Sequence, residues 1–157
     1  MKKLIKKNIT FLICIFALFG CTNKTKLEKD NYLVFKEELL EQEIFTSKEE
    51  LPFDLNISVD KINEEEVSYR AIIDNPKENM NNITALLVHD YINEEIFPSI
   101  GIFDDKINLI VGNNEIKGIN LVGYIKTEKE LNLNLRLYVE YDNDLGEIKK
   151  IYYKTTN

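Results

Sequence analysis

Apolar and polar residues alternate along much of this 157-residue chain after residue 50. The clearest stretch is LNLNLRLYVEY (residues 131–141), in which every odd-numbered position is apolar. A period of two predicts a β-strand with one buried and one wet face, because successive side chains point to opposite sides. Segments 52–62 and 67–74 share this alternation, and the sequence predicts further strands within 83–92, 99–103, 106–112, 118–126 and 147–154.

These predicted strands indicate the fold class. Seven or eight short strands at a spacing of about 10–15 residues are typical of an antiparallel sandwich or barrel. No helices alternate with the strands, so a parallel α/β fold is not expected. The sequence therefore predicts a mainly β fold, an antiparallel immunoglobulin-like β-sandwich. The label is architectural only, because tryptophan is absent and the Cys…Trp…Cys pattern of antibody domains cannot form.

A different period occurs before the strands. Apolar positions fall near helical spacing over residues 32–44, and KEELLEQE (residues 36–43) has high helix propensity. Asp30 or Asn31 is a suitable N-cap. The sequence thus predicts a short N-terminal helix at about 32–44. The alternative is an N-terminal strand from Leu33 to Lys36.

The first 20 residues have the pattern of a secretory signal peptide. Four lysines within residues 1–8 precede an apolar run over residues 9–20. A membrane-spanning helix needs about 20 apolar residues, so this run is too short to cross a bilayer. We expect a signal peptide at 1–20, a polar tether at 21–30 and a single β-sandwich domain with its N-terminal helix at 31–157.

The end of this segment carries a more specific signal. Leu18-Phe19-Gly20-Cys21 resembles the lipobox of bacterial lipoproteins, although Phe19 is bulkier than the usual occupant of its place. The resemblance implies cleavage before Cys21 and a diacylglyceryl group on its sulfur. Two acyl chains anchor a protein stably, whereas one does so only marginally. The implied location is the cell membrane, with the protein lipid-anchored on the extracytoplasmic face.

Two further resemblances concern the remaining chain. The segment YRAIIDNPKENMNNITALLV (residues 69–88) is similar in layout to small immunoglobulin-like modules of bacterial lipoproteins. The chain as a whole resembles uncharacterised small lipoproteins of Gram-positive bacteria. Neither resemblance implies a catalytic residue.

Net charge limits the possible partners. The formal charge is −7, and it becomes −11 without the four lysines of residues 1–20, which contain no acid. A protein this acidic repels nucleic acid and anionic lipid head groups. The expected partners are the membrane, through the lipid anchor, and an envelope protein as a candidate, with no nucleic acid.

The search for catalytic residues finds no convincing constellation. His89 is the one histidine, and Asp90 next to it points to the opposite side of a strand, so the two do not form a triad pair. We interpret His89 as a hydrogen-bonded residue at the edge of the core. Cys14 is lost with the signal and Cys21 is lipidated, which leaves no disulfide and no ligand cluster for a transition metal. No catalytic residue, metal site or cofactor is therefore expected.

Two alternatives rest on acidic residues. The loop over residues 142–147 is rich in Asp, Asn, Gly and Glu, which suits calcium, but its spacing does not fit an EF-hand. The same residue types favour a hairpin turn, which is the interpretation we prefer. Calcium-stabilised adhesion and a cell-envelope hydrolase that uses carboxylates remain the alternative functions.

One apolar segment is a candidate contact with a partner. Phe97, Pro98, Ile100 and Phe103 are concentrated within seven residues. They predict either a core strand entered through a proline turn or a partly exposed loop that binds a partner. A second candidate is the pair at 152–153, because one of two adjacent strand tyrosines must face away from the core. The sequence thus predicts a lipid-anchored accessory or ligand-binding module rather than an enzyme.

Overall fold

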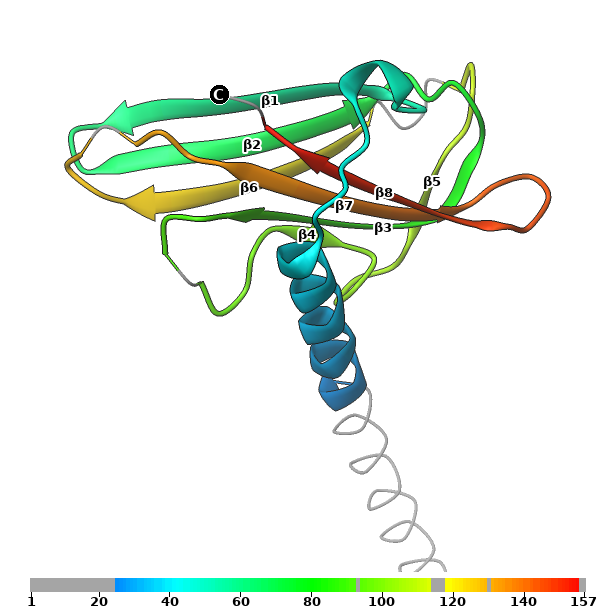
Figure 1. Ribbon diagram of the computed structural model, residues 1–157, viewed down its shortest axis with the longest axis horizontal. Coiled ribbons are helices and arrows are strands. Elements are labelled where there is room, and N and C mark those ends of the chain that lie inside the picture. Colours follow the sequence, from blue (N-terminus) through cyan, green and yellow to red (C-terminus); the bar gives the residue numbers. More distant parts are fainter. Residues whose placement is uncertain (1–24, 93, 114–117, 130, 156–157) are drawn as a thin grey trace, which may run out of the picture.

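The computed structural model describes residues 25–92, 94–113, 118–129 and 131–155, which form two antiparallel sheets and a helix (Figure 1). The three-stranded sheet has the order β1 (Asp54–Asn63), β2 (Glu66–Asp74), β6 (Ile119–Lys126). The five-stranded sheet has the order β4 (Ser99–Ile100), β3 (Met80–His89), β7 (Leu135–Asp142), β8 (Ile148–Lys154), and β5 (Ile107–Leu109) also pairs with β3. The predicted signal peptide and Cys21 lie outside the described residues.

The main hydrophobic core lies between the two sheets. It combines Ala71 and Ile73 of β2 with Leu87 of β3 and Leu137 and Val139 of β7, all of them buried. These are alternate positions of their strands, as the period of two in the sequence requires. The prediction of a mainly β, antiparallel sandwich is therefore confirmed.

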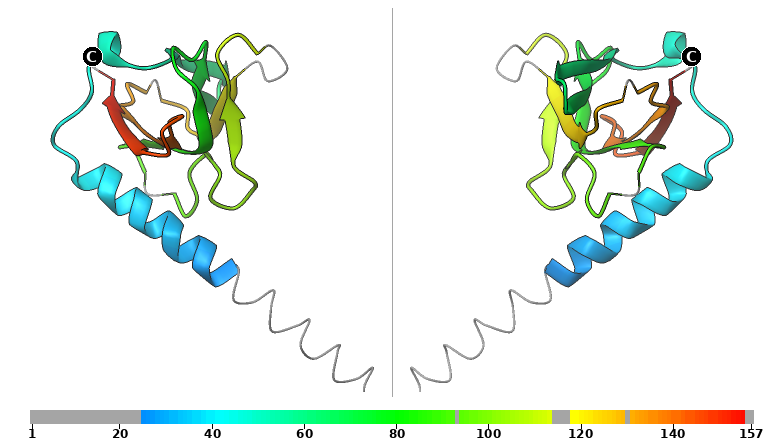
Figure 2. Two further views of the ribbon diagram at one scale, coloured as in Figure 1. Left: turned by 90° about the vertical axis from the view of Figure 1, so that its right-hand side faces the viewer. Right: turned by 90° about the vertical axis from the view of Figure 1, so that its left-hand side faces the viewer.

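Residues 25–41 are helical and cover the outer side of the five-stranded sheet (Figure 2). Tyr32 and Leu39 face the sheet because their spacing places them on one side of a helix. They form a second buried cluster with Leu86 of β3 and Tyr138 of β7. The helix includes residues 25–30, which the sequence assigned to the tether, and it ends before the predicted boundary at 44.

The helix changes the environment of the central strands. Tyr138 and Leu86 point away from the inter-sheet core, yet both are 0% exposed. Strict alternation predicts that these positions are exposed to solvent. They are buried because the helix packs on this face of the sheet. Among the described residues, no helix is long and apolar enough to span a membrane.

Candidate functional site

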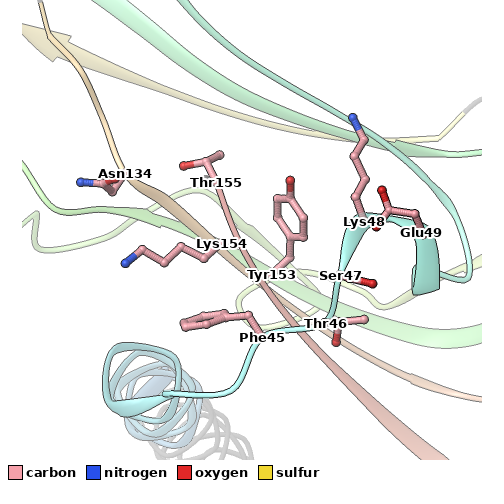
Figure 3. Close-up of a pocket in the computed structure, with 9 residues that line it drawn as sticks. All are labelled: Phe45, Thr46, Ser47, Lys48, Glu49, Asn134, Tyr153, Lys154 and Thr155. Atoms are coloured by element: carbon pink, nitrogen blue, oxygen red, sulfur yellow. The ribbon is translucent and has the colours of Figure 1, made fainter. Parts of the chain in front are cut away.

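A groove of about 690 Å³ lies where the chain leaves the helix and crosses the C-terminal end of β8 (Figure 3). We call it the β8 groove. Its walls include Phe45, Lys48, Asn134, Tyr153, Lys154 and Thr155. Among the described residues, this groove is lined by two aromatic rings, two ammonium groups, the carboxylate of Glu49 and several neutral polar groups.

Backbone hydrogen bonds hold the two walls in place. The N–H of Thr46 donates to the carbonyl of Tyr152 at 2.7 Å, which ties the crossing segment to the open edge of β8. The next residues form a short 3₁₀ turn, η1 (Lys48–Glu50), which begins at Ser47. The Ser47 hydroxyl donates to the Glu50 carboxylate at 2.8 Å and stabilises this turn. The groove is therefore built on fixed backbone rather than on a free loop.

Some polar groups of the groove are already engaged in the fold. The Thr155 hydroxyl accepts the N–H of Leu135 at 3.0 Å, and the Asn134 amide donates to the Asp90 carboxylate. Burial raises the pKa of Asp90, but the hydrogen bonds from Asn134 outweigh that effect, so its pKa is below the usual value. These groups shape the end of the groove.

The two lysines of the groove, Lys48 and Lys154, differ in their ion pairing from the other lysines of β8. Lys149 pairs with Glu147 and Lys150 pairs with Glu38, both at 2.8 Å. Within the described part of the chain, neither Lys48 nor Lys154 forms an ion pair. Figure 3 shows Tyr153 standing between Lys48 on one side and Lys154 with Thr155 on the other.

Arg136 adds a further positive charge beside the groove. It lies opposite Lys154 in the β7–β8 ladder, and its guanidinium carbon is 5.7 Å from the centroid of the Phe45 ring. Its Nη1 donates to the carbonyls of Leu39 at 3.3 Å and Leu40 at 2.6 Å. These are carbonyls of the last helical turn, which lack partners within the helix and carry the negative end of its dipole. Arg136 thus fastens the helix end next to the groove.

A second polar cluster surrounds His89. Its Nε2 lies 2.8 Å from Glu94 Oε1, and its Nδ1 accepts the N–H of Tyr91 at 3.3 Å. The imidazole is 0% exposed and meets the rings of Tyr69 and Phe97 edge-on. Both ring nitrogens are therefore engaged, which confirms His89 as a hydrogen-bonded core residue.

Glu94 connects this cluster to the three-stranded sheet and to the helix. The Tyr69 hydroxyl donates to Glu94 Oε2 at 3.1 Å, and Lys36 Nζ donates to the Glu94 carbonyl at 3.0 Å. Burial, followed by the charge of Glu94, raises the pKa of Tyr69 well above its usual value. The cluster therefore fixes the loop after β3 to both neighbouring layers.

A shallower depression of about 380 Å³ lies above the His89 cluster. Leu40, Tyr91 and Ile92 are exposed on its walls, beside Lys36. It combines apolar side chains of the helix and of the loop after β3. Its polar groups at the base belong to the structural cluster just described.

The structure distributes the predicted partner segment between core and surface. Phe97 is only 3% exposed and packs under the helix, where its N–H donates to the Tyr32 hydroxyl at 2.8 Å. Pro98 and Ile100 are half-buried. Phe103 is 38% exposed, with its ring centroid 5.4 Å from that of Tyr32. Phe97 therefore does not form an exposed contact, because the helix already covers it.

The acidic loop after β7 forms a hairpin turn. The Asn143 side-chain oxygen accepts the N–H of Leu145 and of Glu147 at 3.0 and 2.9 Å, and Gly146 adopts a φ of +75°. These are the contacts expected of an Asx turn, for which Asn and Gly are suited. The turn interpretation of this loop is therefore confirmed. Among the described residues, no three His, Cys, Asp or Glu side chains form a group that could hold a metal ion.

Sequence reasoning did not identify the β8 groove. It singled out Tyr153 only as one of an adjacent pair, and it gave no role to Phe45 or Lys154. These residues are about 110 positions apart along the chain, and a single-strand pattern contains no signal for their proximity. No protein family, characterised protein or solved structure matches this chain.

Proposed function

We propose that the protein is a lipid-anchored module on the extracytoplasmic face of a cell membrane, which binds a ligand or a partner rather than catalysing a reaction. The observation that carries the proposal is Leu18-Phe19-Gly20-Cys21 after a lysine-rich start and a short apolar run. Cleavage before Cys21 leaves only residues 22–24 between the acylated cysteine and the first described helical residue. The domain then sits close to the membrane surface.

An immunoglobulin-like arrangement is part of the proposal. The orders β1-β2-β6 and β3-β7-β8 correspond to strands A-B-E and C-F-G of that fold, with β4 added beside β3. The helix on the outer face of the larger sheet is an addition to this pattern. The correspondence supports a binding role, because such sandwiches hold variable loops and edges on a rigid frame.

The geometry of the titratable groups supports binding over catalysis. The two ring nitrogens of His89 are engaged by Glu94 and Tyr91. A general base needs a nitrogen within reach of the proton that it removes. The β8 groove, in contrast, is open to an outside molecule, and the exposed Lys48 and the half-buried Lys154 lie on its walls.

Lipid attachment at Cys21 tests the proposal. The full chain is expressed in bacteria supplied with labelled palmitate, and its membrane fraction is isolated. The expected result is labelled protein whose mass corresponds to residues 21–157 with a diacylglyceryl group on the N-terminal cysteine. The Cys21→Ser variant should lose the label. Unlabelled protein that retains residues 1–20 would overturn the proposed location.

A further inference from the structure

We propose that the helix over residues 25–41 and the loop after β3 together form a surface that lies on the lipid bilayer. We call this surface the helix–loop face. Its apolar members are Leu33, Leu40, Tyr91, Ile92 and Ile96. The inference rests on the proposed lipid anchor and deepens that proposal by naming the part of the domain that meets the membrane.

Side-chain contacts hold the loop after β3 along one flank of the helix. Lys36 Nζ donates to the carbonyl of Glu94 at 3.0 Å, and Lys29 Nζ lies 3.5 Å from the Glu95 carboxylate. The depression of about 380 Å³ brings the same loop against Leu40. Figure 1 shows this loop on the side of the sheets from which the helix projects. The loop therefore follows the helix for about three turns, from Leu40 to Lys29.

The helix–loop face exposes apolar side chains to solvent. The exposed fractions of its five apolar members lie between 41% and 57%. Leu33 and Leu40 are seven residues apart, so they lie on the same side of the helix, next to the line of Lys29 and Lys36. Clustered apolar side chains of this kind mark an interaction surface rather than ordinary solvated surface.

The position of the lipid anchor identifies the bilayer as the partner of this face. Thr25, the first described residue of the helix, is four residues after Cys21, and four residues span at most about 14 Å. The helix itself is about 25 Å long, and the face extends along it from near the anchored end. A helix that lies along the membrane brings the whole face to the lipid. An upright helix would leave the same apolar groups in water.

The charges around the face also suit a lipid surface. Removal of the four lysines of residues 1–20 changes the formal charge from −7 to −11, so most of the domain repels anionic head groups. On this face Lys29 and Lys36 balance Glu95 and the neighbouring Glu37. Lysine side chains at an interface keep the ammonium group among the head groups while their alkyl stems contact apolar surface. We therefore assign the face to a bilayer with zwitterionic head groups.

The test measures where two matched side chains lie relative to the lipid. The full chain is isolated with its lipid from bacterial membranes and reconstituted in phosphatidylcholine vesicles. Spin labels are attached through Ile96→Cys on the face and Ile62→Cys on β1 of the other sheet, two isoleucines that are 57% and 50% exposed. Collision rates with oxygen, which concentrates in lipid, and with a water-soluble nickel chelate are measured for each label. The ratio of the oxygen rate to the nickel rate should be at least about threefold higher at position 96, because an interfacial surface is buried among head groups and acyl chains.

A second matched pair introduces a charge. In the protein labelled at position 96, Ile92→Asp should lower this ratio by at least about twofold, because a carboxylate resists transfer out of water. Val111→Asp, on the turn after β5, is the control and should leave the ratio within about 20%, since a distant exposed charge is screened. Ile92 and Val111 are 48% and 52% exposed, so both variants should keep the circular dichroism spectrum of the unaltered protein.

Three results would overturn the inference: equal ratios at positions 96 and 62, an unchanged ratio in Ile92→Asp, or shielding of position 96 from both reagents, which would mean that protein covers the face. Mass spectrometry of the same sample reports the lipid at Cys21. Lipidated protein with equal ratios rejects the docking surface alone. Protein without the lipid rejects the proposed anchor and the docking surface with it.

Discussion

At the scale of single residues, Tyr69 and Gly123 show how one side chain depends on the absence of another. The two residues are directly opposite each other in the β2–β6 ladder. A Cβ placed on Gly123 would lie 2.1 Å from Cζ of the Tyr69 ring. The glycine therefore provides the space in which Tyr69 lies across the sheet and reaches Glu94.

Gly123→Ala should destabilise the protein by about 1–3 kcal/mol, because the added methyl group overlaps a fully buried ring. Urea unfolding followed by circular dichroism measures the loss. Asn120→Ala, at an exposed position of the same strand, should change stability by less than about 0.5 kcal/mol. Equal losses in the two variants would mean that Tyr69 can move aside without cost.

His89 shows the limit of inference at this scale. Its apolar neighbours in the sequence were sufficient to predict a satisfied core histidine, because β3 buries such positions. Its partner Glu94 follows in the loop after the strand and is one of three acids within residues 90–95, with Asp90 and Glu95. The choice of Glu94 depends on how that loop folds back, which the local pattern does not specify.

At the scale of elements, the helix over residues 25–41 stabilises the sheet through one face. Leu39 is 0% exposed against β3 and β7, whereas the adjacent Leu40 is 45% exposed. The two residues are chemically identical and lie in the same helical turn. They therefore form a matched pair for measuring the contribution of helix packing.

Leu39→Ala should lower the free energy of unfolding by about 2–5 kcal/mol, as expected for a fully buried leucine that leaves a cavity. Leu40→Ala should lower it by less than about 1 kcal/mol, because much of that side chain is already in water. Denaturant titration of both variants provides the comparison. Similar small effects would indicate that the helix contributes little to the folded state.

The same helix explains the outcome for the predicted partner segment. The sequence left two interpretations open for Phe97, a core residue or a contact in an exposed loop, because an apolar cluster with a proline is compatible with both. The structure buries it beneath the helix together with Ile102. Phe103 stays on the rim with a partly exposed ring, so the prediction of a contact there remains to be tested.

At the scale of the whole molecule, acidic residues link the layers and make stability depend on pH. Glu38 on the helix accepts hydrogen bonds from Lys150 and Tyr152 of β8. Burial alone would raise the pKa of Glu38, but these hydrogen bonds outweigh it and hold the pKa below its usual value of 4.5. The ionised carboxylate therefore favours the folded state over the unfolded chain.

A lowered carboxyl pKa contributes stability above the unfolded value, and that contribution is lost as pH falls through the folded value. The melting temperature should therefore decrease below about pH 4.5 in the unaltered protein. Glu38→Gln should melt at a lower temperature at pH 7 and show a smaller decrease toward pH 3. Glu41→Gln, at an exposed position of the same helix, serves as the control and should keep the full decrease.

Thermal melts by circular dichroism over pH 3–7 measure these slopes. If Glu38→Gln and Glu41→Gln show the same dependence on pH, the bond between helix and β8 does not contribute to acid unfolding. The result would then place the acid sensitivity in other carboxylates, such as Asp90, whose pKa is also lowered.

The sequence by itself determined the class of the fold and the core face of most strands. Alternation over residues 131–141 reports directly which side of a strand is apolar, because side-chain direction in a strand has a fixed period. The hairpin turn after β7 was equally local, since Asn and Gly meet its backbone requirements within a few residues.

Only the tertiary structure decided which surfaces are covered and which remain open. Tyr138 is buried on the outer face because a distant helix packs there, and Phe97 is buried for the same reason. The β8 groove exists because Phe45 and Lys154, far apart in the chain, meet at the end of one strand. Contacts of this kind depend on how the elements pack together, and the periodicity of one element does not specify which other elements pack against it.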